Sequence, residues 1–139
     1  MIVLDTNVIS EPLKPAPAAN VLEWLDRQTP ESLYITTISL AELLMGVEQL
    51  PAGKRKRALA DDLAETLDQL FEDRFLSFDR EAAAAYALLA RRAALRGISI
   101  SFGDGQIAAI AAVHGYTVAT RDVQPFLAAG LTVINPWEV

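Results

Sequence analysis

The sequence predicts an α/β fold in which a parallel sheet of about five strands lies between two layers of helices. Short aliphatic and β-branched runs alternate along the chain with longer segments at helical spacing, and this alternation is typical of a parallel sheet. The first run, Ile2–Leu4, has three large aliphatic residues in succession, as expected of a strand that is buried on both faces. Asp5 follows where this strand ends, and in open α/β sheets ligands bind at the carboxyl ends of the strands.

Composition limits the class of protein. A chain of 139 residues with a hydrophobic share of 52% is expected to form one domain over residues 1–139 with a core of its own. Cysteine is absent, which excludes disulfides, thiolate nucleophiles and cysteine-based zinc sites and suits a reducing compartment. We find no signal-peptide pattern and no membrane-length apolar run, so we expect a cytoplasmic protein. The net charge of −6 argues against broad, nonspecific nucleic-acid binding but not against a local basic cluster.

The first half of the chain continues the alternation after the opening strand. A short helix over residues 8–11 is expected to end at the series of prolines that begins with Pro12, because proline disfavours helix in the residue before it. A helix from about Ala19 to Gln28 and a second strand over residues 33–37 follow. Ser39 and Glu42 then have the spacing of a capping box, which predicts that the next helix starts there and ends near Gln49.

The second half follows the same order. Lys54 begins an amphipathic helix with four basic residues in succession, and this run is a candidate RNA contact as well as an ordinary solvated helix start. Asp79 is a good N-cap for an alanine-rich helix that ends near Gly97. The other expected elements are a strand over 75–78, a loop over 98–103, a helix from about 104 to 115, a strand over 116–119, a short helix over 125–129 and a last strand over 131–134.

Four acids are candidates for chemistry: Asp5, Glu42, Asp104 and Asp122. Each one alone is explained equally well as a helix cap or a first-turn acid. Asp5 and Asp122 follow apolar strands, however, and the other two stand near the starts of helices, so in a right-handed parallel sheet all four junctions lie at the carboxyl edge. Four carboxylates in one small area repel one another unless a cation neutralises them.

Carboxylate oxygens are hard ligands, and the sequence has no cysteine and a single histidine, so the cation predicted for this edge is Mg²⁺ or Mn²⁺. Such an ion, held by one or two carboxylates and several waters, can orient a phosphodiester and activate water. The predicted reaction class is therefore phosphoryl hydrolysis. Thr6, Asn7 and Thr120 are small polar neighbours suited to hold a carboxylate in place, or to act only as turn and cap residues.

The same motifs resemble a known family. The segments that carry the resemblance are Asp5-Thr6-Asn7 after the opening strand, Ile38 to Leu43, Asp104 before Gln106 to Ala109, Thr120-Arg121-Asp122 before Phe126, and the closing Val133 to Trp137. Together they resemble a PIN-domain ribonuclease, and more narrowly a VapC-type toxin of a bacterial type II toxin–antitoxin pair, in its FitB-like branch. The resemblance covers the whole chain and implies a PIN-like α/β/α sandwich.

The resemblance implies that the acids surround one or two divalent metals and cleave single-stranded RNA. It assigns Asp5 and Asp104 as the main metal ligands, and Glu42 and Asp122 as completing an acidic catalytic pocket. It also implies a homodimer, a cognate antitoxin that places a peptide segment in or near the pocket, and contact with DNA only through that antitoxin. One position departs from the family, because many relatives have asparagine after Thr-Arg and an acid three positions later, where this chain has Asp122 and Pro125.

Two other functions remain open on the sequence. A metal-dependent small-molecule phosphatase of the haloacid-dehalogenase type also has an aspartate after its first strand, but it needs a second one two positions later, where this chain has Asn7. A non-enzymatic binding module in which the four acids only cap helices is the second alternative.

Overall fold

A five-stranded parallel sheet organises the computed structural model, which describes residues 1–139. The order of the strands is β3-β2-β1-β4-β5, and every neighbouring pair is parallel. The strands are β1 (Ile2–Leu4), β2 (Leu33–Thr36), β3 (Phe75–Leu76), β4 (Thr117–Ala119) and β5 (Val133–Ile134). The α/β fold with about five parallel strands is therefore confirmed, and the first strand of the chain is the central strand of the sheet.

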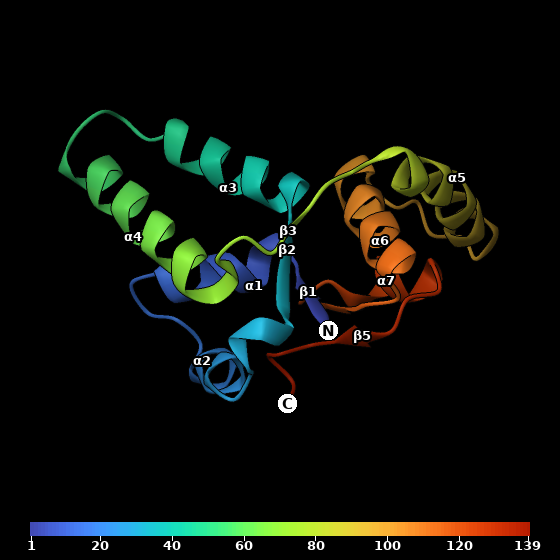
Figure 1. Ribbon diagram of the computed structural model, residues 1–139, viewed down its shortest axis with the longest axis horizontal. Coiled ribbons are helices and arrows are strands. Elements are labelled where there is room, and N and C mark those ends of the chain that lie inside the picture. Colours follow the sequence, from blue (N-terminus) through green and yellow to red (C-terminus); the bar gives the residue numbers. More distant parts are fainter.

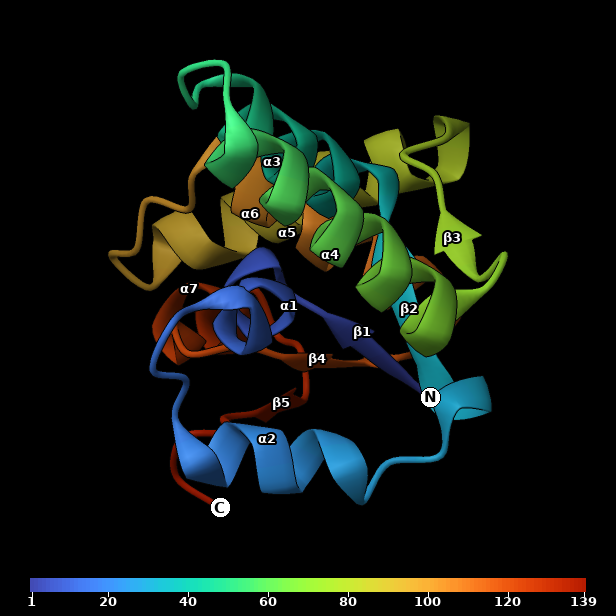
Figure 2. The ribbon, with the colours of Figure 1, turned by 90° about the vertical axis from the view of Figure 1, so that its left-hand side faces the viewer.

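Helices cover both faces of the sheet, as predicted. In Figures 1 and 2, α3 and α4 lie on one side of β1 and β2, while α5 and α6 lie on the other. The helices are α1 (Thr6–Ser10), α2 (Ala19–Asp26), α3 (Thr37–Glu48), α4 (Lys54–Phe71), α5 (Arg80–Leu95), α6 (Phe102–His114) and α7 (Val123–Ala128), with 3₁₀ turns η1 (Glu11–Leu13) and η2 (Pro30–Ser32). None of them combines the length and the apolar character needed to cross a bilayer.

Alternate residues of the central strands supply two separate cores. Leu4 packs with the helices α1 to α4, whereas Val3 packs with α5, α6 and α7. On β4, Ala119 belongs to the first core with Leu4, and Val118 belongs to the second core with Val3. All four side chains are fully buried. Burying a valine or leucine side chain contributes about 1.5 to 3 kcal/mol, so β1 and β4 are held firmly from both sides. Their carboxyl ends therefore emerge from a core that is packed on both faces.

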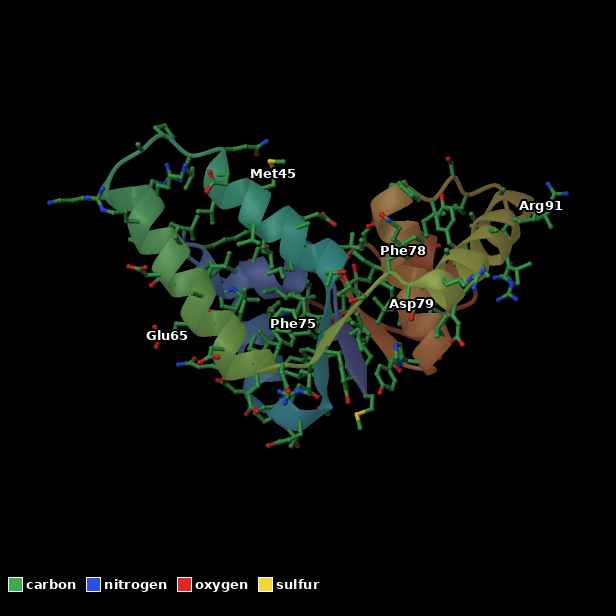
Figure 3. The ribbon with its side chains drawn as sticks, turned by 45° about the horizontal axis from the view of Figure 1, so that its top comes forward. Met45, Glu65, Phe75, Phe78, Asp79 and Arg91 are labelled. Atoms are coloured by element: carbon green, nitrogen blue, oxygen red, sulfur yellow. The ribbon has the colours of Figure 1, made fainter.

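The segment from β3 to α5 crosses between the two cores. Phe75 lies toward α4 and Phe78 lies toward α6 in Figure 3, and they pack against the first and the second core respectively. Asp79 then begins α5, and its carboxylate accepts a hydrogen bond from the backbone amide of Ala82 at 2.9 Å. The predicted N-cap at Asp79 is confirmed.

Two predicted helix starts differ from the structure. The prediction that Ser39 caps a helix is wrong, because α3 already begins at Thr37 and its cap is Thr36, whose hydroxyl accepts a hydrogen bond from the amide of Ser39 at 3.1 Å. Likewise α6 begins at Phe102, inside the predicted loop. Its cap is Ser101, whose hydroxyl accepts from the amide of Asp104 at 3.2 Å.

The cap at Thr36 gives a first prediction. Thr36 is fully buried, and loss of an N-cap hydroxyl typically costs about 1 kcal/mol. Thr36→Ala is therefore expected to lower the free energy of unfolding by about that amount, measured by urea denaturation. Thr36→Ser keeps the acceptor oxygen and is expected to retain most of the stability. Equal losses in the two variants would show that the methyl group, not the cap, stabilises α3.

Candidate active site

Asp5 is buried and held by donors on three sides. Only 4% of its surface is exposed. One carboxylate oxygen, Oδ1, accepts from the amide of Thr6 at 2.8 Å, while Oδ2 accepts from the Thr120 hydroxyl at 2.8 Å and from the Asn7 side-chain amide at 3.3 Å. Asp5 thus does cap α1, as the simpler interpretation of the sequence expected. Its second oxygen is fixed by side chains that have no part in that cap.

Thr120 and Asn7 join the ends of β1 and β4. The amide of Asp5 donates to the carbonyl of Ala119 at 2.9 Å, which continues the pairing of the two strands beyond their last residues. Asn7 Nδ2 also lies 3.4 Å from the Thr120 hydroxyl, and Asn7 Oδ1 accepts from the amide of Arg121 at 3.3 Å. Asn7 and Thr120 therefore hold a carboxylate in place, as their position in the sequence suggested.

Glu42 lies in the second turn of α3, outside the capping positions. The nearby Thr6 hydroxyl lowers the pKa of Glu42, and this hydroxyl donates a hydrogen bond to Ser39 Oγ at 3.0 Å. A Cβ atom built on Gly103 would lie 3.6 Å from Glu42 Oε1. The first turn of α6 therefore passes directly beside Glu42. Because α3 is capped by Thr36, a capping role does not explain this acid.

Asp104 stands in the first turn of α6 and is half-buried. Gly105 behind it is buried, and a Cβ atom there would lie 2.5 Å from the ring of Tyr86. That ring packs edge-on against Phe102 and Phe78, with centroids 5.2 and 6.4 Å apart. The lack of a side chain at Gly105 thus lets α5 and α6 pack closely and sets the position of Asp104. The sequence offered one signal for this contact, the glycines on both sides of Asp104.

Asp122 precedes α7 but its side chain makes no capping hydrogen bond. Its amide donates to the Thr120 hydroxyl at 3.1 Å, which keeps the exposed Asp122 side chain next to the end of β4. Its charge acts on both Asp5 and Asp104. The capping interpretation therefore fails for Asp122 as well as for Glu42.

The four acids influence one another electrostatically. Burial raises the pKa of Asp5 above its ordinary value, and the carboxylates of Asp104 and Asp122 raise it further, against the hydrogen bonds of Thr120 and Thr6 that lower it. Burial also raises the pKa of Glu42, followed by the charges of Asp5 and Asp104. The pKa of Asp104 is raised by burial and then by Asp122. The structure thus brings the predicted site residues into one electrostatic group.

The ligand atoms available at this edge are carboxylate oxygens, and these are the ligands that Mg²⁺ and Mn²⁺ prefer. A cation near these acids would also relieve the repulsion that raises their pKa values. No three acidic or histidine side chains converge closely enough to hold a metal ion among them. The arrangement fits coordination by two carboxylates with water in the remaining positions, which is common for Mg²⁺.

The raised pKa values predict how stability changes with pH. An acid whose pKa is higher in the folded than in the unfolded protein stabilises the fold below the unfolded pKa, and this contribution is lost as the pH rises through the folded pKa. Without divalent cations, Asp104→Asn is therefore expected to melt at a higher temperature than the wild type at pH 7, with the difference shrinking toward about pH 4. Thermal unfolding in chelator across this range measures the effect. A difference that does not change with pH would contradict it.

The contact between Gly105 and Tyr86 gives a separate prediction. Gly105→Ala forces the Tyr86 ring to move, and overpacking of this kind costs roughly 1 to 3 kcal/mol. Tyr86→Ala removes the obstacle, so the double variant is expected to be more stable than the sum of the two single losses indicates. Urea unfolding of all four proteins tests the coupling. Additive losses would show that Gly105 is needed for another reason.

Comparison with known proteins identifies the family. Residues 2–130 match the model of the PIN domain. The chain is 51% identical to the plasmid stability protein StbB of Pseudomonas syringae pv. tomato, 49% identical to the VapC ribonuclease Y4jK of Sinorhizobium fredii and 47% identical to the toxin FitB of Neisseria gonorrhoeae. Each of these alignments covers 99% of both chains.

Solved structures agree with this result. The crystal structure of FitAcB from Neisseria gonorrhoeae superposes with a TM-score of 0.94 at 47% identity over 100% of both chains. The structure of FitAB bound to an IR36 DNA fragment gives a TM-score of 0.95 at 45% identity, covering 100% of this chain and 97% of the other. The chain therefore belongs to the PIN-domain family, and within it to the group of the VapC and FitB toxins.

Proposed function

We propose that this protein is the toxin of a type II toxin–antitoxin pair and an endoribonuclease that hydrolyses single-stranded RNA with Mg²⁺ or Mn²⁺. The observation that carries the proposal is the electrostatic group formed by Asp5, Glu42, Asp104 and Asp122 at the carboxyl edge of the sheet. Helix capping explains neither Glu42 nor Asp122. The family relationship supports the same reaction, since one relative is named a ribonuclease.

Asp5 and Asp104 would hold the metal. When bound, Mg²⁺ or Mn²⁺ would supply positive charge to the phosphodiester and lower the pKa of an attacking water. Asp5 suits this position because Thr120 and Asn7 fix its carboxylate before any ligand arrives, which is the role of residues behind a metal ligand. Asp104 suits it because the contact between Gly105 and Tyr86 fixes the start of α6.

Glu42 is assigned as the acid that orients the water and accepts its proton. It is exposed, and burial of part of its side chain together with the charges of Asp5 and Asp104 raises its pKa. A carboxylate with a raised pKa is a stronger base near neutral pH. The Thr6 hydroxyl lies near Glu42 and partly offsets this rise in its pKa.

Asp122 is assigned to the fourth corner of the pocket. Its position in the sequence departs from the pattern common in the family, yet its charge acts on Asp5 and Asp104. This effect supports the view that Asp122 takes the place of the acid that relatives have three positions later. Asp122 is suited to contact the metal through a bound water, because its side chain is exposed and makes no hydrogen bond to the start of α7.

The partners follow from the relatives. The structures named FitAcB and FitAB contain a FitB-type chain, and FitAB is described as bound to DNA. We propose that residues 1–139 form a single PIN domain that assembles as a homodimer with a cognate antitoxin, which inserts a peptide segment in or near the pocket. DNA contact would come through the antitoxin, and cleavage of cellular RNA places the toxin in the cytoplasm.

The two other functions find less support. In a phosphatase of the haloacid-dehalogenase type, a second aspartate would stand at position 7, whereas here the Asn7 side-chain amide donates to Asp5. A binding module with four capping acids is at odds with Glu42 and Asp122, which cap nothing.

Substitution of the two metal ligands tests the proposal. Asp5→Asn and Asp104→Asn are each expected to reduce metal-dependent RNA cleavage at least about a hundredfold, since changes even behind a metal ligand cost 10 to 100-fold. Both are also expected to lose the rise in melting temperature that Mn²⁺ gives the wild type. Cleavage of labelled single-stranded RNA and thermal melting with and without Mn²⁺ measure the two effects.

Asp79→Asn is the matched control. It changes an aspartate of the same charge that caps α5, and asparagine caps helices as well as aspartate does, so cleavage and the response to Mn²⁺ should stay as in the wild type. Full activity in Asp5→Asn would refute the mechanism. A wild type whose melting temperature does not respond to Mn²⁺ would favour the binding module.

A further inference from the structure

Arg121 and Trp137 emerge side by side at the edge of the sheet that carries the acids. Ala119 on β4 pairs with Ile134 on β5, and the amide of Thr120 donates to the carbonyl of Ile134 at 2.9 Å. The residues that follow the two strands therefore leave the sheet together. The guanidinium carbon of Arg121 lies 5.1 Å from the centre of the Trp137 ring, within the distance at which a cation is attracted to an aromatic face.

Trp137 is fixed before any ligand binds. Its amide donates to the side chain of Asn135 at 3.0 Å, and its carbonyl accepts a hydrogen bond from the side chain of Asn20 on α2. Figure 2 shows α2 beside β5 and the C-terminus. Trp137 also packs against the first core and is half-buried. Arg121 thus lies over a ring that the fold holds in one place.

The guanidinium of Arg121 has no hydrogen-bond partner in the chain. Its side chain is exposed, and neither ion pair of the structure includes it. Asp122 is its neighbour in sequence, yet the two side chains do not pair. The backbone amide of Arg121 is used, since it donates to Asn7 Oδ1. A guanidinium carries its N–H donors in a planar fork, and all those of Arg121 are free to bind an anion.

The surroundings of Arg121 make a phosphate the expected partner. Among the residues that directly follow β1, β2, β4 and β5, Arg121 has the only basic side chain. The acids at this edge repel an RNA chain, and a cation beside them offsets part of that repulsion. A planar guanidinium matches two oxygens of a phosphate and binds them through parallel hydrogen bonds. Arg121 is therefore suited to bind the backbone of RNA.

The Trp137 ring directs this contact away from the metal ligands. Trp137 follows β5, which lies on the side of β4 away from β1 and Asp5. The guanidinium stacked on the ring is therefore held toward β5. Asp5 and Asp104 are assigned to the metal that acts on the scissile phosphodiester, so the phosphate that suits Arg121 is one that flanks it.

We propose that Arg121 binds a phosphate of the RNA that flanks the scissile phosphodiester, on the β5 side of the acids, and that Trp137 holds its guanidinium in position for this contact. The inference rests on the proposed ribonuclease function and assigns a residue that binds its substrate. Contacts to phosphate carry no sequence information. Arg121 therefore fixes the position of the strand without selecting its sequence.

Charge removal at Arg121 tests the phosphate contact. Arg121→Gln is expected to weaken binding of a fluorescent single-stranded RNA of mixed sequence about tenfold at low salt. The slope of log affinity against log salt should fall by about 0.7, the value for one phosphate on a single strand. Fluorescence anisotropy without divalent cations keeps the RNA intact during the measurement.

Two further variants serve as controls. Arg91→Gln removes the same charge from the outer side of α5, where Arg91 is exposed and outside both ion pairs, as Figure 3 shows. It should leave affinity and slope as in the wild type, and equal losses in the two glutamine variants would overturn the proposal. Arg121→Lys keeps the charge but not the planar fork, so it should keep the slope and lose part of the affinity.

Cleavage kinetics test the position of the phosphate. Arg121→Gln is expected to raise KM for RNA cleavage with Mg²⁺ about tenfold while leaving kcat within about twofold, as loss of uniform binding predicts. A fall in kcat at unchanged KM would place the contact at the scissile phosphodiester and overturn the assignment to a flanking phosphate.

A double-variant cycle tests the role of Trp137. Trp137→Leu is expected to weaken RNA binding about threefold, because the guanidinium loses its aromatic support, while Trp137→Phe should keep most of the affinity. Arg121→Gln should then cost less in the Trp137→Leu protein than in the wild type. Thermal melting checks that each variant is folded. Losses that simply multiply would show that Trp137 does not act through Arg121.

The outcomes separate this inference from the proposed function. Unchanged RNA affinity in Arg121→Gln would overturn it, and if inhibition by the co-expressed antitoxin were weakened in the same variant, the partner of Arg121 would be an acidic peptide. Absence of any cleavage by the wild type would instead contradict the ribonuclease function. In that case the anisotropy comparison of Arg121→Gln with Arg91→Gln still decides whether Arg121 binds RNA.

Discussion

The hydrogen bond from the Thr120 hydroxyl to Asp5 is the contact on which the arrangement of the site depends. Parallel pairing places Leu4 opposite Ala119, so the next residue of each strand emerges at the same height of the sheet edge. Both side chains are shielded from water, which makes their mutual hydrogen bond necessary as well as favourable. The same hydroxyl accepts the amide of Asp122 and thereby brings the fourth acid to the site.

Several carboxylates lie around this contact, where burial and mutual repulsion make their charged forms unfavourable. Burial and mutual repulsion raise the pKa values of Asp5, Glu42 and Asp104 together, and the ion pairs of the structure include none of these acids. The donors around Asp5 offset only part of that cost. Groups of this kind, held under strain by a rigid scaffold, are characteristic of functional sites. A divalent cation would complete the balance of charge.

The sequence predicted the features that depend on local order along the chain. Alternation of strands and helices gave the parallel sheet, and the position of Asp5 and Asp104 at element boundaries gave their place at its edge. It misplaced the start of α3 because the predicted second strand included Thr36 and left Ser39 as the cap. In the structure Thr36 ends the strand and also caps the helix, while the Ser39 side chain accepts from Thr6. The fit of Gly105 under Tyr86 and the contact of Arg121 with Trp137 arise where separate elements meet, so no local pattern reveals them.

The central claim is that the acidic group cleaves RNA with a divalent cation. The most direct measurement incubates a pool of cellular RNA with the purified protein, with Mg²⁺ and with chelator, and sequences the new ends. New internal ends are expected in single-stranded regions with Mg²⁺ and none with chelator. New ends that form equally well in chelator, or an RNA pool left intact with Mg²⁺, would contradict it.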